Sequence, residues 1–130
     1  MFKVYSKDDM GKAPMLELST TAGETYKYGE ALVLSSGKLT KCGATTKPTY
    51  ICMKDYIAPE TDEEAIPVIR VNDNIVFKVT NVNELTGVEI GTKVTLSADG
   101  LQITSTTTDG VAEIVSKDGD AIGSEVLIRF

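Results

Sequence analysis

Residues 29–35 have the sequence GEALVLS, and a related segment, GTKVTLS, follows at residues 91–97, an offset of 62 (91 − 29). Residues 51–55 (ICMKD) return as residues 114–118 (IVSKD), an offset of 63 (117 − 54). Residues 68–71 (VIRV) return as residues 127–130 (LIRF), an offset of 59 (129 − 70). Three matched blocks in the same order predict a tandem duplication of a unit of about 60 residues.

Each copy contains the pattern of a short hairpin. In the first, an apolar segment at 30–34 meets a turn at Ser35-Ser36-Gly37 and leaves through 38–41. In the second, the Asp99-Gly100 turn separates two alternating segments, at 93–96 and 101–104, and Asp-Gly between such segments is a strong hairpin signal. Further apolar strands are expected at 15–18, 50–53, 66–71, 75–79, 111–115 and 126–130.

These short strands and close turns predict an all-β fold, a small barrel or sandwich built from two tandem, pseudo-symmetric copies of the unit. We expect residues 1–12 to form an N-terminal arm and residues 13–130 a single compact domain. Copy one then covers residues 13–71 and copy two covers residues 72–130. Because about 60 residues would be marginally stable alone, the copies should fold against each other.

The formal net charge of −6 is unevenly distributed. Residues 1–71 hold 9 basic and 10 acidic side chains (−1), and residues 72–130 hold 4 and 9 (−5). The sequence has no basic stripe with interleaved aromatic residues, which disfavours nucleic-acid binding. It also has no apolar run of the roughly 18 residues that a membrane span needs. The first residues lack the apolar core of a secretion signal, so we expect production in the cytoplasm.

The chain contains no histidine, which excludes Ser-His-Asp and Cys-His nucleophile systems and histidine-based metal sites. Lys54-Asp55 and Lys117-Asp118 are the charged pair common to both copies, but both follow an apolar strand, where a structural role is the favoured interpretation. A carboxylate hydrolase ranks last, since neither copy presents two acids at matched positions. We therefore expect no enzymatic activity, catalytic residue, metal or cofactor.

Cys42 and Cys52 are ten positions apart and form no CxxC motif. In the repeat, Cys52 aligns with Val115, and Cys42 falls opposite Ser105 and Thr106. This exchange predicts small core or strand residues rather than a disulfide or a metal pair.

Contact residues are expected where the copies differ. These are the N-terminal arm and the acidic loop by which copy one is longer than copy two. The candidates are Lys3, Lys7, Asp8 and Asp9 in the arm, and Glu60, Asp62, Glu63 and Glu64 in the loop. An alternative is a carbohydrate-binding or adhesin-like module that stacks a ligand on Tyr26 and Tyr28.

Part of copy one has the order of elements seen in one family. A Gly-Glu-Ala phrase opens an apolar strand, and a Gly-Lys-Leu turn, a threonine-rich stretch, a short strand, an acidic loop and a final V-x-R-V-like strand follow. The corresponding residues are 29–34, 37–39, 44–46, 50–53 and 66–71. In these features the chain resembles the head-decoration (capsid cement) proteins of tailed bacteriophages and prophages.

The resemblance implies a β-barrel-like module that binds the major capsid protein on an assembled capsid and stabilises the lattice without chemical turnover. The protein would be assembled in the bacterial cytoplasm and reside on the virion surface. Proteins of this kind often form trimers, although some are monomers. The chain departs from the family by carrying two copies of the unit, which puts a simple trimer in doubt, and two fused units would replace one oligomeric contact.

Overall fold

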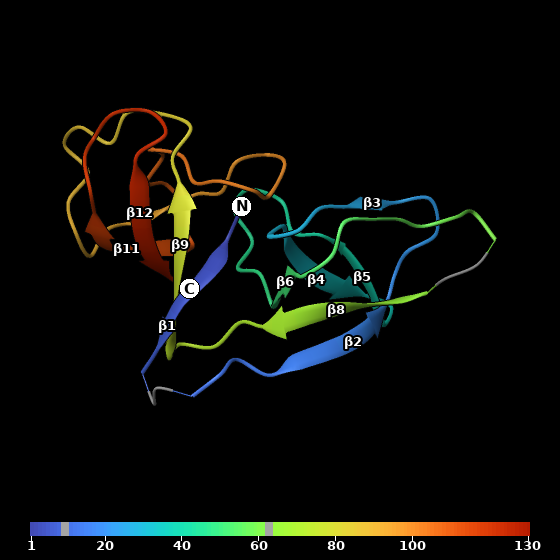
Figure 1. Cartoon of the computed structure of the whole chain (residues 1–130). Coiled ribbons are helices and arrows are strands. Elements are labelled where there is room, and N and C mark those ends of the chain that lie inside the picture. Colours follow the sequence, from blue (N-terminus) through green and yellow to red (C-terminus); the bar gives the residue numbers. More distant parts are fainter. Residues whose placement is uncertain (9–10, 62–63) are drawn as a thin grey trace.

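Two five-stranded antiparallel sheets make up the fold (Figure 1). The computed structural model describes residues 1–8, 11–61 and 64–130. Sheet A has the order β1 (Lys3–Lys7), β9 (Ile75–Thr80), β12 (Glu125–Arg129), β11 (Ala112–Lys117), β10 (Lys93–Val94). Sheet B has the order β2 (Met15–Ser19), β8 (Ala65–Arg70), β6 (Tyr50–Cys52), β4 (Ala31–Ser35), β5 (Lys38–Lys41).

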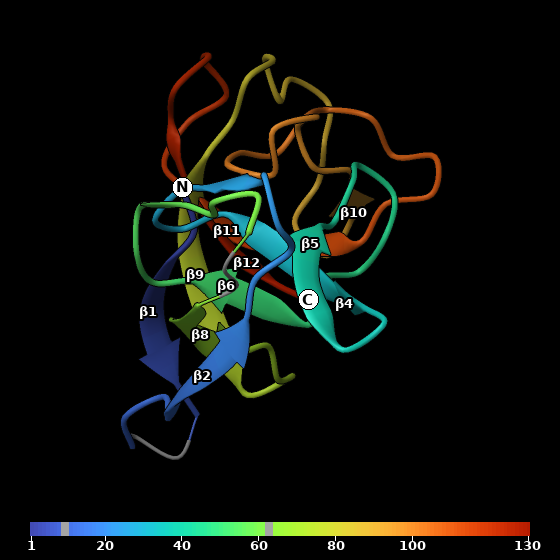
Figure 2. The same ribbon diagram turned by 90° about the vertical axis from the view of Figure 1, so that its right-hand side faces the viewer.

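The short strands β3 (Thr25–Tyr26) and β7 (Tyr56–Ile57) form a separate pair. The prediction of an all-β fold with a sandwich-like arrangement is thus confirmed. Seen from the end, as in Figure 2, the strands of sheet B lie in front of those of sheet A. Within the described residues, no helix is long and apolar enough to cross a membrane.

The duplication is visible in the strand order. In sheet B the order β2-β8-β6-β4 corresponds, strand for strand, to β9-β12-β11-β10 in sheet A. The two copies also share an unusual closure. A parallel bridge joins Thr20, directly after β2, to Leu39, and another joins Asn81, directly after β9, to Ile103. Each copy therefore curls until the end of its first strand, β2 or β9, is bridged to the return segment of the hairpin.

The strand pairing corrects the sequence alignment around Cys52. The parallel bridges at Thr20 and Asn81 relate β2 to β9 at an offset of 61 (81 − 20). Through the partners of these strands Val68 corresponds to Ile128, an offset of 60 (128 − 68), so the match of VIRV with LIRF is one residue out of register. Cys52, which pairs with Val68, therefore corresponds to Ile114, which pairs with Ile128. All four side chains are fully buried. Val115, to which the sequence match had assigned Cys52, lies in a bulge and is 36% exposed. One extra residue in copy two therefore changes the offset from 62 before the bulge to 63 after it.

The second hairpin is less regular than predicted. Strand β10 has only two residues, and Leu96 meets Ile103 in a single antiparallel bridge. The Ser97 hydroxyl replaces part of the ladder, because it accepts a hydrogen bond from the Gln102 amide at 3.0 Å and donates one to the Asp99 carboxylate at 2.6 Å.

The expected N-terminal arm is instead part of the sheet. Strand β1 pairs with β9 along one edge of sheet A. Phe2 is 1% exposed, and its amide donates to the Gly29 carbonyl of copy one at 2.8 Å. A β-carbon on Gly29 would lie 2.5 Å from that of Met1. Phe2 therefore packs between the two copies, and removal of its aromatic side chain from water stabilises this position of β1.

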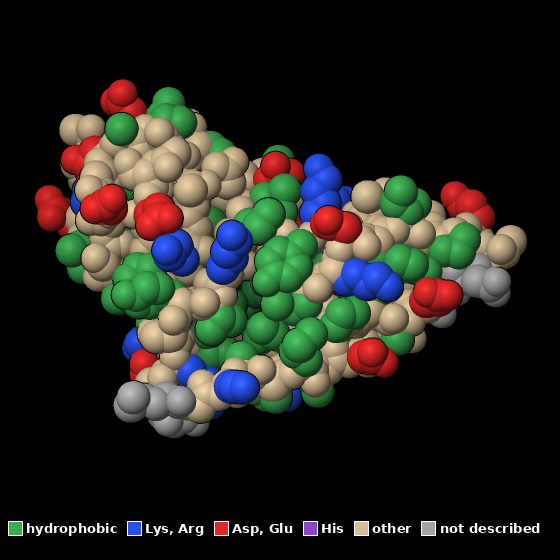
Figure 3. Space-filling model, in the orientation of Figure 1, with side chains coloured by type: hydrophobic (Ala, Val, Ile, Leu, Met, Phe, Trp, Pro, Cys, Tyr) green, Lys and Arg blue, Asp and Glu red, His purple; other side chains and the backbone are tan. Residues whose placement is uncertain are grey.

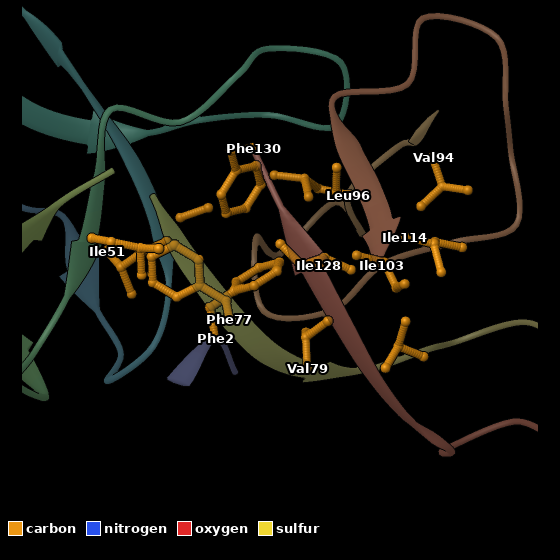
Figure 4. Close-up of a cluster of buried hydrophobic side chains, with 14 of the residues drawn as sticks. Phe2, Ile51, Phe77, Val79, Val94, Leu96, Ile103, Ile114, Ile128 and Phe130 are labelled. Atoms are coloured by element: carbon orange, nitrogen blue, oxygen red, sulfur yellow. The ribbon is translucent and has the colours of Figure 1, made fainter. Parts of the chain in front are cut away.

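A shared hydrophobic cluster connects the copies. It contains the interior side chains of sheet A together with Ala31, Ile51 and Ile69 from one face of sheet B. Figure 4 shows Ile51 beside Phe2, Phe77 and Phe130. The opposite face of sheet B lines a smaller cluster formed by Tyr26, Leu32, Leu39, Cys52, Ala58, Ile66 and Val68.

Backbone bonds also cross between the copies. The Ala31 amide donates to the Gly100 carbonyl at 2.9 Å, and the Leu96 amide donates to the Ala44 carbonyl at 2.9 Å. Gly100 has φ +70°, and a β-carbon there would approach the Ala31 carbonyl to 3.3 Å. The turn that the sequence predicts in copy two is therefore also a contact with copy one.

Candidate protein-contact surface

The first group of predicted contact residues lies on and after β1. Lys3 is exposed and Lys7 is half-buried. Asp8 is held in place, because its amide donates to the Asn74 carbonyl at 2.8 Å and its carboxylate accepts a hydrogen bond from Arg129 at 3.2 Å. Asp9 lies outside the described residues. These side chains decorate an edge strand rather than a free arm.

The second group lies in the acidic loop before β8. Asp62 and Glu63 fall outside the described residues, whereas Glu60 and Glu64 are exposed. The Glu60 carboxylate lies over Gly23, since a β-carbon there would approach its Oε1 to 2.8 Å. The Glu64 carbonyl accepts hydrogen bonds from the amide and hydroxyl of Thr20.

The structure does not bring the two groups together. Glu64 meets Thr20, directly after the end of β2, whereas the segment that follows β1 leads into the start of β2. In Figure 1 the strand β1 and the beginning of β8 accordingly lie on different sides of the molecule. A single contact surface formed by both groups is therefore not supported by their positions.

Of the two tyrosines of the alternative ligand face, Tyr26 is buried and cannot stack on a ligand. Tyr26 is 1% exposed, and its hydroxyl donates to the Leu39 carbonyl at 2.7 Å and accepts from the Thr21 amide at 2.8 Å. Burial raises the pKa of this hydroxyl, and the hydrogen bond from Thr21 opposes the rise. Tyr28 is half-buried. Tyr26 is a core residue because its hydroxyl finds two backbone partners inside the sheet.

The two Lys-Asp pairs have structural contacts. Asp55 accepts a hydrogen bond from the Tyr28 amide at 2.8 Å, and the Lys54 ammonium lies 5.5 Å from the ring centre of Tyr56. In copy two, Lys117 donates to the Val88 carbonyl at 2.8 Å and also binds the Asp120 carboxylate. Among the described residues, no group of three or more His, Cys, Asp or Glu side chains is arranged to hold a metal ion.

Both cysteines are buried free thiols, as predicted for core residues. Cys42 belongs to the shared cluster and Cys52 to the smaller one, and each thiol donates to a backbone carbonyl. Burial raises the pKa of both, that of Cys42 to about 11. Such thiols stay protonated and weakly nucleophilic at neutral pH.

The sequence did not identify the exposed apolar side chains of the two edge strands. Of the ten exposed large hydrophobic residues in the described part of the chain, five lie within the first 16 positions. We call these five the apolar edge: Met1, Val4 and Tyr5 at β1, and Met15 and Leu16 on β2. Figure 3 shows hydrophobic side chains gathered in the hollow between β1 and the β2–β8 pair.

The sequence predicted a strand at residues 15–18, but it did not predict which strands lie beside it. The exposure of the apolar edge depends on that strand order, so it was missed. Strands β1 and β2 are the terminal strands of their sheets. A terminal strand that exposes both backbone groups and apolar side chains is typical of a site of protein contact.

A depression of 610 Å³ lies on another part of copy one, between β4, β6 and β8. Val33, Leu34, Tyr50 and Arg70 are among its lining residues. Lys47 also lines it and lies 3.6 Å from the Asp73 carboxylate, so part of the positive charge at this depression is balanced.

Comparison of the sequence with models of known protein families and with curated proteins finds no match. The interpretation of the surface accordingly rests on the fold and on the chemistry of the exposed side chains.

Proposed function

We propose that the protein is a non-enzymatic structural protein of a tailed phage or prophage, which binds the major capsid protein on the assembled capsid and stabilises the capsid surface. The apolar edge is the observation that carries this proposal. Met15 is 58% exposed, Tyr5 58% and Met1 46%. Exposed apolar side chains on the terminal strands of the two sheets favour association with another protein surface, since contact removes them from water.

The resemblance to head-decoration proteins is the reason for assigning the major capsid protein as the partner at this contact. The residues that carry it lie in consecutive elements of sheet B: β4, its turn to β5, β6 and β8. In sheet B these elements stand beside β2, which is the terminal strand. In this role the protein resides on the virion surface after assembly in the bacterial cytoplasm, and trimers at local three-fold positions belong to the same proposal.

The test mixes purified protein with expanded, undecorated capsids of the source phage and measures co-sedimentation. We expect saturable binding, and we expect bound protein to raise the temperature at which the capsids disrupt. Met15→Glu should weaken binding, whereas Ile122→Glu, a change at an isoleucine of copy two that is 66% exposed, should leave binding unchanged. No co-sedimentation, together with absence of the protein from purified virions, would overturn the proposal.

A further inference from the structure

The duplication supplies an internal comparison between the strands β2 and β9. Leu16 pairs with Val68 in copy one, and Phe77 pairs with Ile128 at the same place in copy two. Along its other edge β9 carries β1, whereas β2 is the terminal strand of sheet B. The same position in the unit is therefore occupied by a strand in one copy and open in the other.

Exposure of the side chains follows this difference. Phe77 is fully buried, and its counterpart Leu16 is 40% exposed. Val76 is 6% exposed, and its counterpart Met15 is 58% exposed. Two apolar positions are thus buried in copy two, where β1 pairs with β9 and Phe130 packs on Phe77, and are exposed in copy one.

Of the two terminal strands that carry the apolar edge, β1 and β2, the second is the better acceptor. The pairing of β1 with β9 is irregular between Val4 and Ser6, and β1 begins and ends with a lysine. Bulges and edge lysines are devices that protect a strand against pairing. Strand β2 pairs with β8 in unbroken register over five residues and contains no lysine. Its free edge therefore lacks this protection.

Charge identifies the chemistry of the incoming strand. Within sheet A, Lys3 of β1 lies opposite Lys78 of β9, a pairing of like charges. The counterpart of Lys78 in β2 is Glu17, which is exposed. If a strand pairs with β2 in the register of β1, its residue at the place of Lys3 lies opposite the Glu17 carboxylate. A basic residue is therefore favoured at that place. Opposite charges stabilise a cross-strand pair and like charges destabilise it.

We propose that the free edge of β2 binds one extended strand of the partner protein, antiparallel to β2, with a basic side chain opposite Glu17 and an apolar side chain opposite Leu16. Main-chain hydrogen bonds to β2 supply affinity, and these two side chains supply specificity. The inference rests on the proposed function only in assigning that strand to the capsid protein.

The edge itself is tested without capsids, by titrating the isotope-labelled full chain with a peptide of the sequence MFKVYSKD, which is that of residues 1–8. We expect the largest amide shifts at residues 15–19. A peptide with glutamate in place of its first lysine should bind at least about threefold more weakly. The chain variant Glu17→Lys should reverse this preference. Shifts absent from β2, or equal for both peptides, would overturn the inference.

The capsid assay then separates the two proposals. Leu16→Lys should lower capsid affinity at least about tenfold, because a lysine protects the edge. The matched control is Leu34→Lys, since Leu34 is 41% exposed but lies on the interior strand β4. If the wild type fails to bind capsids, the proposed function fails while the peptide titration still decides the edge. If Leu16→Lys and Leu34→Lys both bind capsids like the wild type, the protein binds capsids but not through the free edge of β2.

Discussion

At the scale of single residues, the thiol of Cys42 makes stability depend on alkaline pH. Burial raises its pKa to about 11 from an ordinary value of about 9. Because the folded state favours the protonated form, this contribution is complete below about pH 9 and is lost as the pH rises through about 11. We expect a loss on the order of 2 kcal/mol in the free energy of unfolding across this window.

The measurement is urea unfolding at several pH values for the wild type and for Cys42→Ser. Serine keeps a donor for the Thr46 carbonyl, which accepts from the thiol at 2.8 Å. The variant should lack this part of the alkaline loss. An equal pH dependence in both proteins would show that the thiol does not contribute.

Glu30 is a second residue with a predictable energetic role. Its side chain is 2% exposed, and it accepts hydrogen bonds from the Lys41 ammonium at 2.7 Å and the Lys27 amide at 2.9 Å. We expect Glu30→Ala to lower the free energy of unfolding by about 2 kcal/mol, since the change removes a buried carboxylate together with its hydrogen bonds to the Lys27 amide and the Lys41 ammonium.

Lys47→Ala is the control for Glu30→Ala. Lys47 lies 3.6 Å from Asp73 and both side chains are largely exposed, so its loss should cost less than about 0.5 kcal/mol. Urea unfolding of the two variants at pH 7 measures the difference. Equal effects would contradict the structural role assigned to Glu30.

At the scale of elements, β1 is fixed by the residue before it. Phe2 is buried, and its ring lies 5.4 Å from that of Phe130. We expect Phe2→Ala to lower the free energy of unfolding by about 3 kcal/mol, because the change opens a cavity in the shared cluster. Tyr5→Ala, on the same strand but 58% exposed, should cost less than about 1 kcal/mol. Thermal and urea unfolding of both variants test this. If Phe2→Ala leaves the free energy of unfolding unchanged, residues 1–7 behave as a free arm and not as part of sheet A.

The elements also show what the sequence could predict. Alternation of apolar residues and the Asp99-Gly100 turn were sufficient for most strands and for the repeat. Strand β1 was assigned to an arm because it has no counterpart in the repeat, and its place depends on the open edge of β9, which is about 70 residues away along the chain.

The bulge at Val115 was also invisible in the sequence. An extra residue in a strand leaves the flanking residues recognisable, so the ICMKD and IVSKD segments matched although Cys52 and Val115 are not equivalent. The apolar edge was missed for a related reason. Whether Met15 and Leu16 are buried depends on what lies beside β2, and strand order is a property of the whole sheet.

At the scale of the whole molecule, copy one should not fold without copy two. Ala31, Ile51 and Ile69 form one face of sheet B and are buried in the cluster shared with sheet A. A fragment of residues 13–71 would expose this face and is also near the lower size limit of a stable domain. We expect the fragment to give a collapsed amide spectrum, and the full chain to unfold in a single calorimetric transition. A dispersed spectrum for the fragment would show two independent domains.

The central claim is that the apolar edge attaches the protein to a capsid, and hydrogen exchange of the free and capsid-bound protein tests it most directly. We predict that binding slows amide exchange in β1 and β2, whose outer edges carry Val4, Tyr5, Met15 and Leu16. Exchange near Ile57, Ile90 and Ile122, which are also exposed but lie elsewhere on the chain, should not change. Protection confined to those three regions, or unchanged exchange throughout β1 and β2 in the bound protein, would contradict the claim.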